Sequence, residues 1–144
     1  MRGDYIKVIP GSNLECNVIL CLAFSPDNTS LAGGGAEDRL LYQWSVWESS
    51  TTPTRTFTGH TYLVYSVVYT SPNQMVSGPM TDELLVWDVA SGACTQVLAG
   101  HTGDPLRLID GNINPCSTDH AVILWDLQTG ACTKVLDEHT GVSC

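Results

Sequence analysis

The sequence has 144 residues, the size of one ordinary domain, and 43% of them are apolar while only 15% are charged. This composition favours a folded chain over a disordered one. Fifteen acidic residues against six Lys and Arg leave a net charge of −9, which repels a nucleic acid duplex or an anionic membrane surface. We therefore expect neither nucleic acid nor membrane as a partner.

The first part of the chain contains two predicted strands. Tyr5 to Ile9 is one short strand, closed by a Pro-Gly turn, and Val18 to Phe24 is the longest apolar run. Seven residues are too few to span a bilayer but have the length of a buried strand. Residues 1–10 lack the apolar core of a secretory signal. We therefore expect a chain in the cytosol or nucleus, where thiols stay reduced.

Short strands separated by turns dominate the middle of the chain. Within residues 60–100 the apolar positions alternate with a period of two, and Pro, Asn, Gly and Asp residues interrupt them. The predicted strands are Val64 to Tyr69, Met75 to Ser77, Leu84 to Trp87 and Cys94 to Leu98. Four short strands in a unit of about forty residues are typical of one blade of a β-propeller.

The chain also repeats itself. The segment from Trp87 to Leu98 matches the segment from Trp125 to Leu136 without a gap at an offset of 38 residues. Trp-Asp, Gly-Ala-Cys-Thr and Val-Leu recur in both copies. A weaker copy lies upstream, where Trp44 stands 43 residues before Trp87. Internal repeats of this period are typical of propellers and solenoids.

These recurring motifs resemble those of a known family. They are Phe24-Ser25-Pro26-Asp27, Gly59-His60-Thr61, Val76-Ser77-Gly78, Trp87-Asp88, Gly100-His101-Thr102-Gly103, Asp119 and Trp125-Asp126. As a registered series they make residues 5–144 resemble the WD-repeat β-propellers. The resemblance implies an all-β fold of three four-stranded antiparallel blades. Because closed rings have about four to eight blades, three blades would form an incomplete, open propeller.

The resemblance also divides the chain. We expect an N-terminal strand and linker over residues 1–14, repeat one over 15–59, repeat two over 60–100, a degenerate repeat three over 101–139 and a tail over 140–144. Pro105 stands where the inner strand of repeat three should begin, and proline is a poor residue for a central strand. Repeat three is therefore expected to be the least regular.

In this family a His, a Ser, an Asp and a Trp form a hydrogen-bonded network within each blade. The matching positions are His60, Ser77, Asp82 and Trp87 in repeat two, His101, Asp119 and Trp125 in repeat three, and Asp38 and Trp44 in repeat one. Asp82 lies one residue late, and Gly33 and Pro115 occupy the Ser positions of repeats one and three. Because such networks satisfy buried polar groups mutually, incomplete sets predict weaker blades.

Three repeats are fewer than a closed ring needs, and three explanations stay open. The chain is part of a larger propeller that was cut short, or a short natural protein that assembles with copies of itself or with another propeller, or a decayed repeat. A wedge of three blades would leave apolar faces uncovered. We therefore expect self-association or pairing with additional propeller blades.

No catalytic, cofactor or metal site is predicted. Ser77 with His60 and Asp82 resembles a hydrolase triad, but no Gly-x-Ser-x-Gly motif is present and the blade network explains the same residues. The histidines at repeat-equivalent turns belong to different blades, which argues against a shared metal. Residues 33–35 are three glycines without a following Lys-Ser/Thr, so they are not a phosphate loop. We expect them to loosen the second strand of repeat one.

An interaction scaffold is the function that remains. The resemblance implies that partners bind the loops at one end of the ring, and the residues in or beside those loops are Glu37, Tyr62, Leu63, Met80, Asp104 and Thr118. We predict a non-catalytic scaffold for other proteins, within a larger propeller or multisubunit assembly. Two alternatives stay open. One is a substrate-receptor or regulatory segment, as in a ubiquitin ligase adaptor or a signalling ATPase, and the other is a decayed fragment without function.

Overall fold

A computed structural model describes residues 18–35, 37–79, 83–99, 105–107, 116–117 and 122–136. Every regular element in these residues is a β-strand, so the predicted all-β class is confirmed. The strands are β1 (Ile19–Phe24), β2 (Ser30–Gly35), β3 (Leu41–Ser45), β4 (Arg55–Phe57), β5 (Val64–Ser71), β6 (Gln74–Pro79), β7 (Glu83–Asp88), β8 (Cys94–Ala99), β9 (Pro105–Arg107), β10 (Cys116–Ser117), β11 (Val122–Asp126) and β12 (Ala131–Leu136).

Eight of these strands form two four-stranded antiparallel sheets. Blade one consists of β1 to β4 and blade two of β5 to β8, and in both the strands are hydrogen-bonded in chain order. The two blades also share an irregularity, since the first hairpin of blade one has a bulge at Leu20 and that of blade two has one at Tyr65. The blades are therefore structural repeats of one another, as the sequence repeat predicts.

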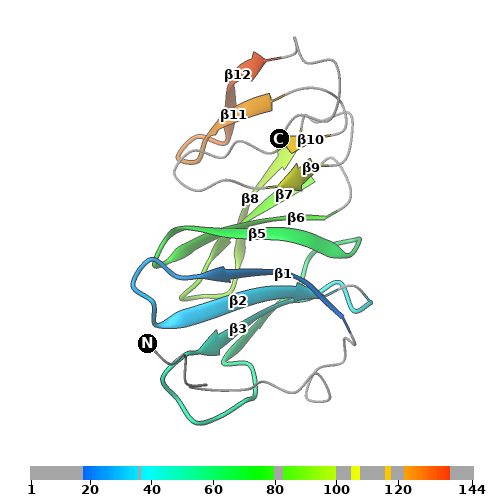
Figure 1. Ribbon diagram of the computed structural model, residues 1–144. Helices are drawn as coiled ribbons and strands as arrows, with labels where there is room; N and C mark the ends of the chain where they lie inside the picture. Colours follow the sequence, from blue (N-terminus) through cyan, green and yellow to red (C-terminus); the bar gives the residue numbers. More distant parts are fainter. Residues whose placement is uncertain are drawn as a thin grey trace, which may run out of the picture.

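The third unit is described only in part, and its described residues form two-stranded ladders. Strand β9 pairs with β10 and β11 pairs with β12, and these ladders are two separate two-stranded sheets. Pro105 opens β9 without an N–H group to donate. Strand β10 has only two residues, which is too short to support a ladder on both of its edges. Figure 1 shows the sheets side by side in an open array that does not close into a ring.

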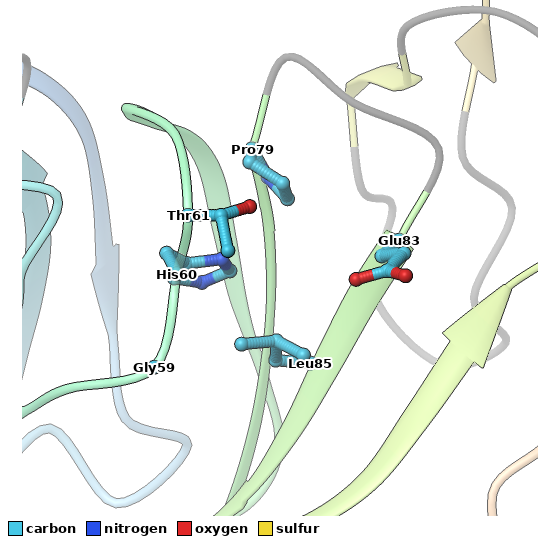
Figure 2. Close-up of a pocket in the computed structure, with 6 residues that line it drawn as sticks. All are labelled: Gly59, His60, Thr61, Pro79, Glu83 and Leu85. Carbon is cyan, nitrogen blue, oxygen red and sulfur yellow. The ribbon is translucent and has the colours of Figure 1, made fainter.

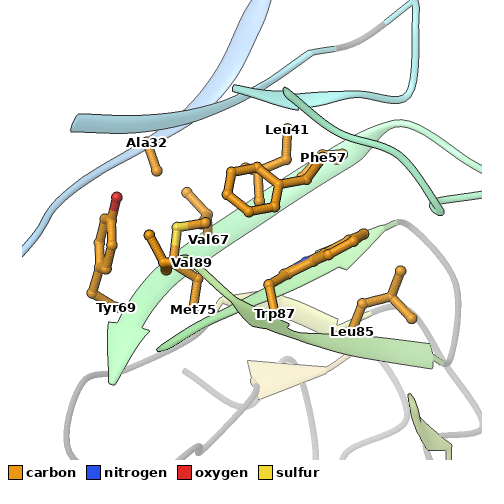
Figure 3. Packing of buried hydrophobic residues seen from close by; sticks show 10 residues of the cluster. Ala32, Leu41, Phe57, Val67, Tyr69, Met75, Leu85, Trp87 and Val89 are labelled. Atoms are coloured by element: carbon orange, nitrogen blue, oxygen red, sulfur yellow. The ribbon is translucent and has the colours of Figure 1, made fainter. Parts of the chain in front are cut away.

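The main hydrophobic core lies between blades one and two. Strands β1 and β2 of blade one lie against β5, the first strand of blade two. Figure 3 shows Ala32, Leu41 and Phe57 of blade one facing Trp87 and its neighbours in blade two. The rings of Phe57 and Trp87 pack edge to face, with their centroids 5.6 Å apart. The chain thus buries its largest side chains between blades, where two apolar sheet faces meet.

The glycines of β2 lie in a regularly paired strand. Residues 31–34 are paired with both β1 and β3. A Cβ atom on Gly34 would lie 2.5 Å from Cγ1 and 2.6 Å from Cβ of Val64. The absence of a side chain at Gly34 therefore allows the first strand of blade two to pack closely against blade one.

The repeated Trp-Asp and Gly residues build one kind of turn. The Asp88 carboxylate accepts hydrogen bonds from the Ser91 backbone N–H at 2.7 Å and the Ser91 hydroxyl at 2.8 Å. Gly92, with φ of 76°, donates its N–H to the Asp88 carbonyl at 2.8 Å. Asp126 and Gly130 make the corresponding turn between β11 and β12. A left-handed φ favours glycine, and this explains why both copies of the repeat place Gly four residues after Asp.

Candidate functional site

A hydrogen-bonded network crosses the buried interior of blade two. The indole N–H of Trp87 on β7 donates to the Ser77 hydroxyl oxygen on β6 at 2.7 Å. The same hydroxyl lies 2.6 Å from Nε2 of His60, in the segment between β4 and β5. All three side chains are buried, and the His60 ring also packs edge-on against Trp87. The network therefore joins a loop to two central strands.

The His60 ring is neutral within this network. The Trp87 indole can only donate, so the Ser77 hydroxyl oxygen accepts from it. The donor across the 2.6 Å contact between Ser77 and His60 depends on the tautomer of the imidazole ring. Burial lowers the pKa of His60 to about 4, which agrees with a neutral ring at physiological pH.

A small cavity adjoins this histidine. Its walls are Gly59, His60, Thr61, Pro79, Glu83 and Leu85 (Figure 2). In Figure 2, Glu83 of β7 and the His60 ring face the cavity from opposite sides. The enclosed space admits about one water molecule. It is too small for an organic substrate.

Among the described residues of blade one, no corresponding network is present. The indole N–H of Trp44 is buried and has no hydrogen-bond partner among these residues, and Gly33 supplies no hydroxyl at the position of Ser77. Asp38 instead accepts hydrogen bonds from the Tyr42 hydroxyl and from the Leu40 N–H, the latter at 3.0 Å. Asp38, which the resemblance placed in the network of repeat one, therefore orders the β2–β3 turn through these two hydrogen bonds.

Trp125 of β11 is also buried, and its indole N–H has no hydrogen-bond partner within the part of the chain that the structure describes. Its ladder position matches that of Trp87, since Trp125 pairs with Cys132 as Trp87 pairs with Cys94. The other network positions predicted from the sequence lie outside the described residues. These are Asp82, His101 and Asp119.

Two loops of different origin meet at one end of the molecule. Arg39 lies in the β2–β3 turn of blade one, and its Nη1 donates to the backbone carbonyl of Thr61 at 3.3 Å. Thr61 belongs to the segment that leads into blade two. The hydrogen bond therefore brings Glu37 of the first loop and Tyr62 of the second to the same end, and we call the surface formed by Glu37, Arg39 and Tyr62 the loop end.

The predicted partner-binding residues are only partly covered by the structure. Glu37 is exposed, Tyr62 is 56% exposed and Leu63 is half-buried. Met80, Asp104 and Thr118 lie outside the described residues. Sequence reasoning missed Arg39, whose left-handed φ of 61° and hydrogen bond to Thr61 tie the two loops together. Nothing in the repeat pattern marks this residue, because the other copies have no equivalent arginine.

A second residue pair that the sequence did not single out lies within the interface between the blades. The side-chain amide of Gln43 on β3 donates to the Tyr69 hydroxyl on β5 at 3.2 Å. Both residues are buried, and burial raises the pKa of Tyr69 to about 12. The pair adds a polar contact to the apolar cluster that contains Tyr69, Phe57 and Trp87.

Two searches of the described ranges bear on function. No group of three or more His, Cys, Asp and Glu side chains there is arranged to hold a metal ion. Within the same ranges, no helix has the length and apolar character needed to cross a membrane.

Comparison with known proteins adds two findings. Residues 3–45 match the family described as "WD domain, G-beta repeat". The protein named "Small ribosomal subunit protein RACK1" of Glycine max is 32% identical over 80 residues, which are 53% of this chain and 25% of that relative. The chain thus covers a quarter of the relative's length. The two four-stranded blades are consistent with these matches to the WD-repeat family.

Proposed function

We propose that this chain is a non-catalytic scaffold that binds other proteins through its loop end. The observation that carries the proposal is the Arg39–Thr61 hydrogen bond, which holds loops of two blades together. The exposed ring of Tyr62 stands beside it, and aromatic and Arg side chains are enriched at the energetic centres of protein interfaces. WD-repeat domains typically act as interaction scaffolds, which supports the same proposal.

The net charge of the chain and the surroundings of the His60–Ser77 pair also support a non-catalytic, protein-binding role. A net charge of −9 opposes binding to nucleic acid. The His60–Ser77 pair adjoins a cavity that holds about one water molecule, and the Ser77 hydroxyl is engaged by Trp87. The pair therefore serves stability and not hydrolysis. We also propose a location in the cytosol or nucleus, and the name of the RACK1 relative, a ribosomal subunit protein, favours the cytosol.

Site-specific photo-crosslinking tests this function. A photoreactive phenylalanine analogue replaces Tyr62 at the loop end, and the same analogue replaces Trp47 as a matched control. Trp47 is 68% exposed and follows β3 at the opposite end of blade one. We expect position 62, and not position 47, to yield a discrete protein adduct in cells. Equal labelling at both positions, or adducts with nucleic acid alone, would contradict the proposal.

The identity of the adduct also separates the finer alternatives. A substrate-receptor segment should crosslink to proteins that turn over through a ligase, whereas a regulatory segment should crosslink to other parts of its own assembly. Tyr62→Ala should weaken the crosslinked complex by about 10-fold or more if Tyr62 anchors the partner, since a hot-spot truncation costs about 2 kcal/mol. Trp47→Ala should leave the affinity unchanged.

A further inference from the structure

The connection between the third and fourth strands is longer in blade one than in its repeats. Nine residues, 46–54, separate β3 from β4, whereas five residues separate β7 from β8 and four separate β11 from β12. Ser45 and Ser49 stand at the positions of Asp88 and Gly92, so the residues that build the tight turn are missing. We call residues 46–54 the β3–β4 loop. Insertions of this kind in one repeat are often functional.

Hydroxyl groups occupy the exposed part of the β3–β4 loop. Ser49, Ser50 and Thr52 are all exposed. The hydroxyls of Ser50 and Thr52 are hydrogen-bonded to each other at 2.7 Å, and the Thr52 N–H donates to the Ser50 hydroxyl oxygen at 3.3 Å. These bonds stay within the loop. The Thr52 hydroxyl can therefore exchange its partner without disrupting a strand.

The chain is extended directly after Thr52. Pro53 restricts the residue before it to extended backbone. The Thr54 N–H then donates to the Gln43 carbonyl at 2.7 Å, and Arg55 opens β4 opposite Gln43. Among the described strands β4 pairs with β3 alone, so this segment lies at an edge of blade one. An enzyme that binds an extended segment finds the conformation already formed, which lowers the cost of binding.

The same four residues carry a chemical pattern. Thr52 has a hydroxyl, Pro53 follows it, and a partly exposed Arg55 stands three positions after it. Proline has no N–H group, so it suits an enzyme site that has no acceptor for an amide at that point. Arginine binds carboxylates through charge-assisted hydrogen bonds. We infer that Thr52 is the phosphoryl acceptor of a proline-directed protein kinase with an acidic subsite for Arg55.

The structure separates Thr52 from the two other hydroxyl residues that precede a proline. Ser25 is 2% exposed, and its hydroxyl is engaged by two groups of its own turn at 2.6 and 2.9 Å. Ser71 is half-buried, and its hydroxyl accepts from a turn N–H at 3.3 Å. The third residue after them is not basic, since it is Asn28 in one case and Gln74 in the other. Thr52 alone combines exposure with the complete pattern.

Phosphoryl transfer to Thr52 uses ATP as the co-reactant. Oγ1 of Thr52 forms a bond to the γ-phosphorus, the bond from this phosphorus to the bridging oxygen of ATP breaks, and ADP leaves. The hydroxyl proton passes to the catalytic-loop aspartate of the kinase. The product adds a charge of about −1.5 to −2 to the loop at pH 7. Because the β3–β4 loop is separate from the loop end, the inference does not depend on the proposed function.

Incubation of the full chain with ATP and a purified cyclin-dependent kinase, which is proline-directed, tests the inference. Mass spectrometry should show one added phosphate, and peptide mapping should place it on Thr52. Thr52→Ser should retain the modification and Thr52→Ala should lose it. Arg55→Gln should lower kcat/KM about 10-fold, as expected for the loss of one charge-assisted hydrogen bond. Ser71→Ala is the matched control and should be modified like the unsubstituted chain.

A synthetic peptide of residues 47–58 separates the sequence pattern from its presentation by the fold. Modification of the peptide but not of the folded chain would overturn the inference, because the loop would then be inaccessible. Modification of neither would overturn it as well, because the kinase would not recognise the pattern. Phosphate on Ser25 or Ser71 at the rate of Thr52 would contradict the assignment of the site. If Thr52→Ala does not fold, peptide mapping of the unsubstituted chain still decides.

Discussion

Ser77 is the residue that two buried groups of blade two share. Its hydroxyl oxygen accepts from the Trp87 indole N–H at 2.7 Å and forms a second hydrogen bond with Nε2 of His60 at 2.6 Å. Replacing it with Ala leaves a buried N–H and a buried ring nitrogen without partners, which costs about 1–3 kcal/mol each for an unsatisfied group. We expect Ser77→Ala to lower the free energy of unfolding by about 2 kcal/mol or more in urea denaturation.

The hydroxyl-retaining variant Ser77→Thr is the control for this prediction. Threonine keeps a hydroxyl group at this position. The decrease in the free energy of unfolding should therefore be smaller for Ser77→Thr than for Ser77→Ala and should reflect only the added methyl group. Equal stability of Ser77→Ala and the unsubstituted chain would contradict the role assigned to the hydroxyl.

His60 predicts a dependence of stability on pH. Its pKa is about 4 in the folded chain and about 6.5 in an unfolded one, so the unfolded state binds the proton more readily. The contribution of His60 is complete above pH 6.5 and is lost as the pH falls toward 4, to a total of about 3 kcal/mol. We expect the free energy of unfolding to decline over this range in urea titrations at fixed pH.

His60→Gln isolates this contribution from those of the other titrating groups. The difference in unfolding free energy between the unsubstituted chain and His60→Gln should shrink as the pH falls from 6.5 to 4. A difference that stays constant over this interval would show that His60 is not buried in neutral form.

The network residues illustrate what the sequence could and could not predict at this scale. His60, Ser77 and Trp87 were expected to act together because the resemblance to WD repeats implies it, and the structure brings them within hydrogen-bond distance. The bond from Tyr42 to Asp38 was not foreseeable, because it depends on a tyrosine that the repeat does not require. The approach of the Arg39 loop to Thr61 is likewise a property of the folded backbone.

At the scale of the strands, Gly34 determines how closely the blades approach. A methyl group there would overlap the Val64 side chain, at 2.5 Å from Cγ1 and 2.6 Å from Cβ. The Cβ atom of Val64 is bonded directly to the β5 backbone and cannot rotate away. The two blades would therefore have to separate. We expect Gly34→Ala to destabilise the chain by about 1–3 kcal/mol, as overpacking does, measured by chemical denaturation.

Gly33→Ala is the matched control on the same strand. Its nearest neighbour would be the Cδ2 atom of Leu22 at 2.9 Å, and this exposed side chain can rotate away. The loss at Gly33 should therefore be smaller than the loss at Gly34. The reverse order would contradict the assigned contact between β2 and β5.

Strand prediction succeeded where alternation and turn residues coincide. The four runs expected in residues 60–100 correspond to β5 to β8, although β6 continues through Pro79, which the sequence marks as a turn residue. Pro79 has no N–H group to donate to a neighbouring strand. It can therefore stand at the end of β6, where only its carbonyl group is available for pairing. In the third unit the apolar positions also alternate with a period of two. There β9 begins at Pro105, β10 is short, and the described strands form two separate two-stranded ladders.

At the scale of the whole molecule, packing between blades one and two is the main source of the stability of the fold. Phe57 and Trp87 come from different blades, are both fully buried, and pack edge to face at 5.6 Å. A sheet that is apolar on both faces gains stability mainly from its neighbours, as in other repeat proteins. The two described blades should therefore unfold together, and the side chains at their interface should be energetically coupled.

A double-mutant cycle on Phe57→Leu and Trp87→Phe tests this account most directly. Both substitutions shorten side chains at the interface without introducing polar groups. Urea unfolding of the four proteins should give single transitions, with a coupling energy of about 0.5–1.5 kcal/mol between the two sites. Additive effects, or two separate transitions for the two blades, would contradict the claim that blades one and two form one cooperative unit through their shared face.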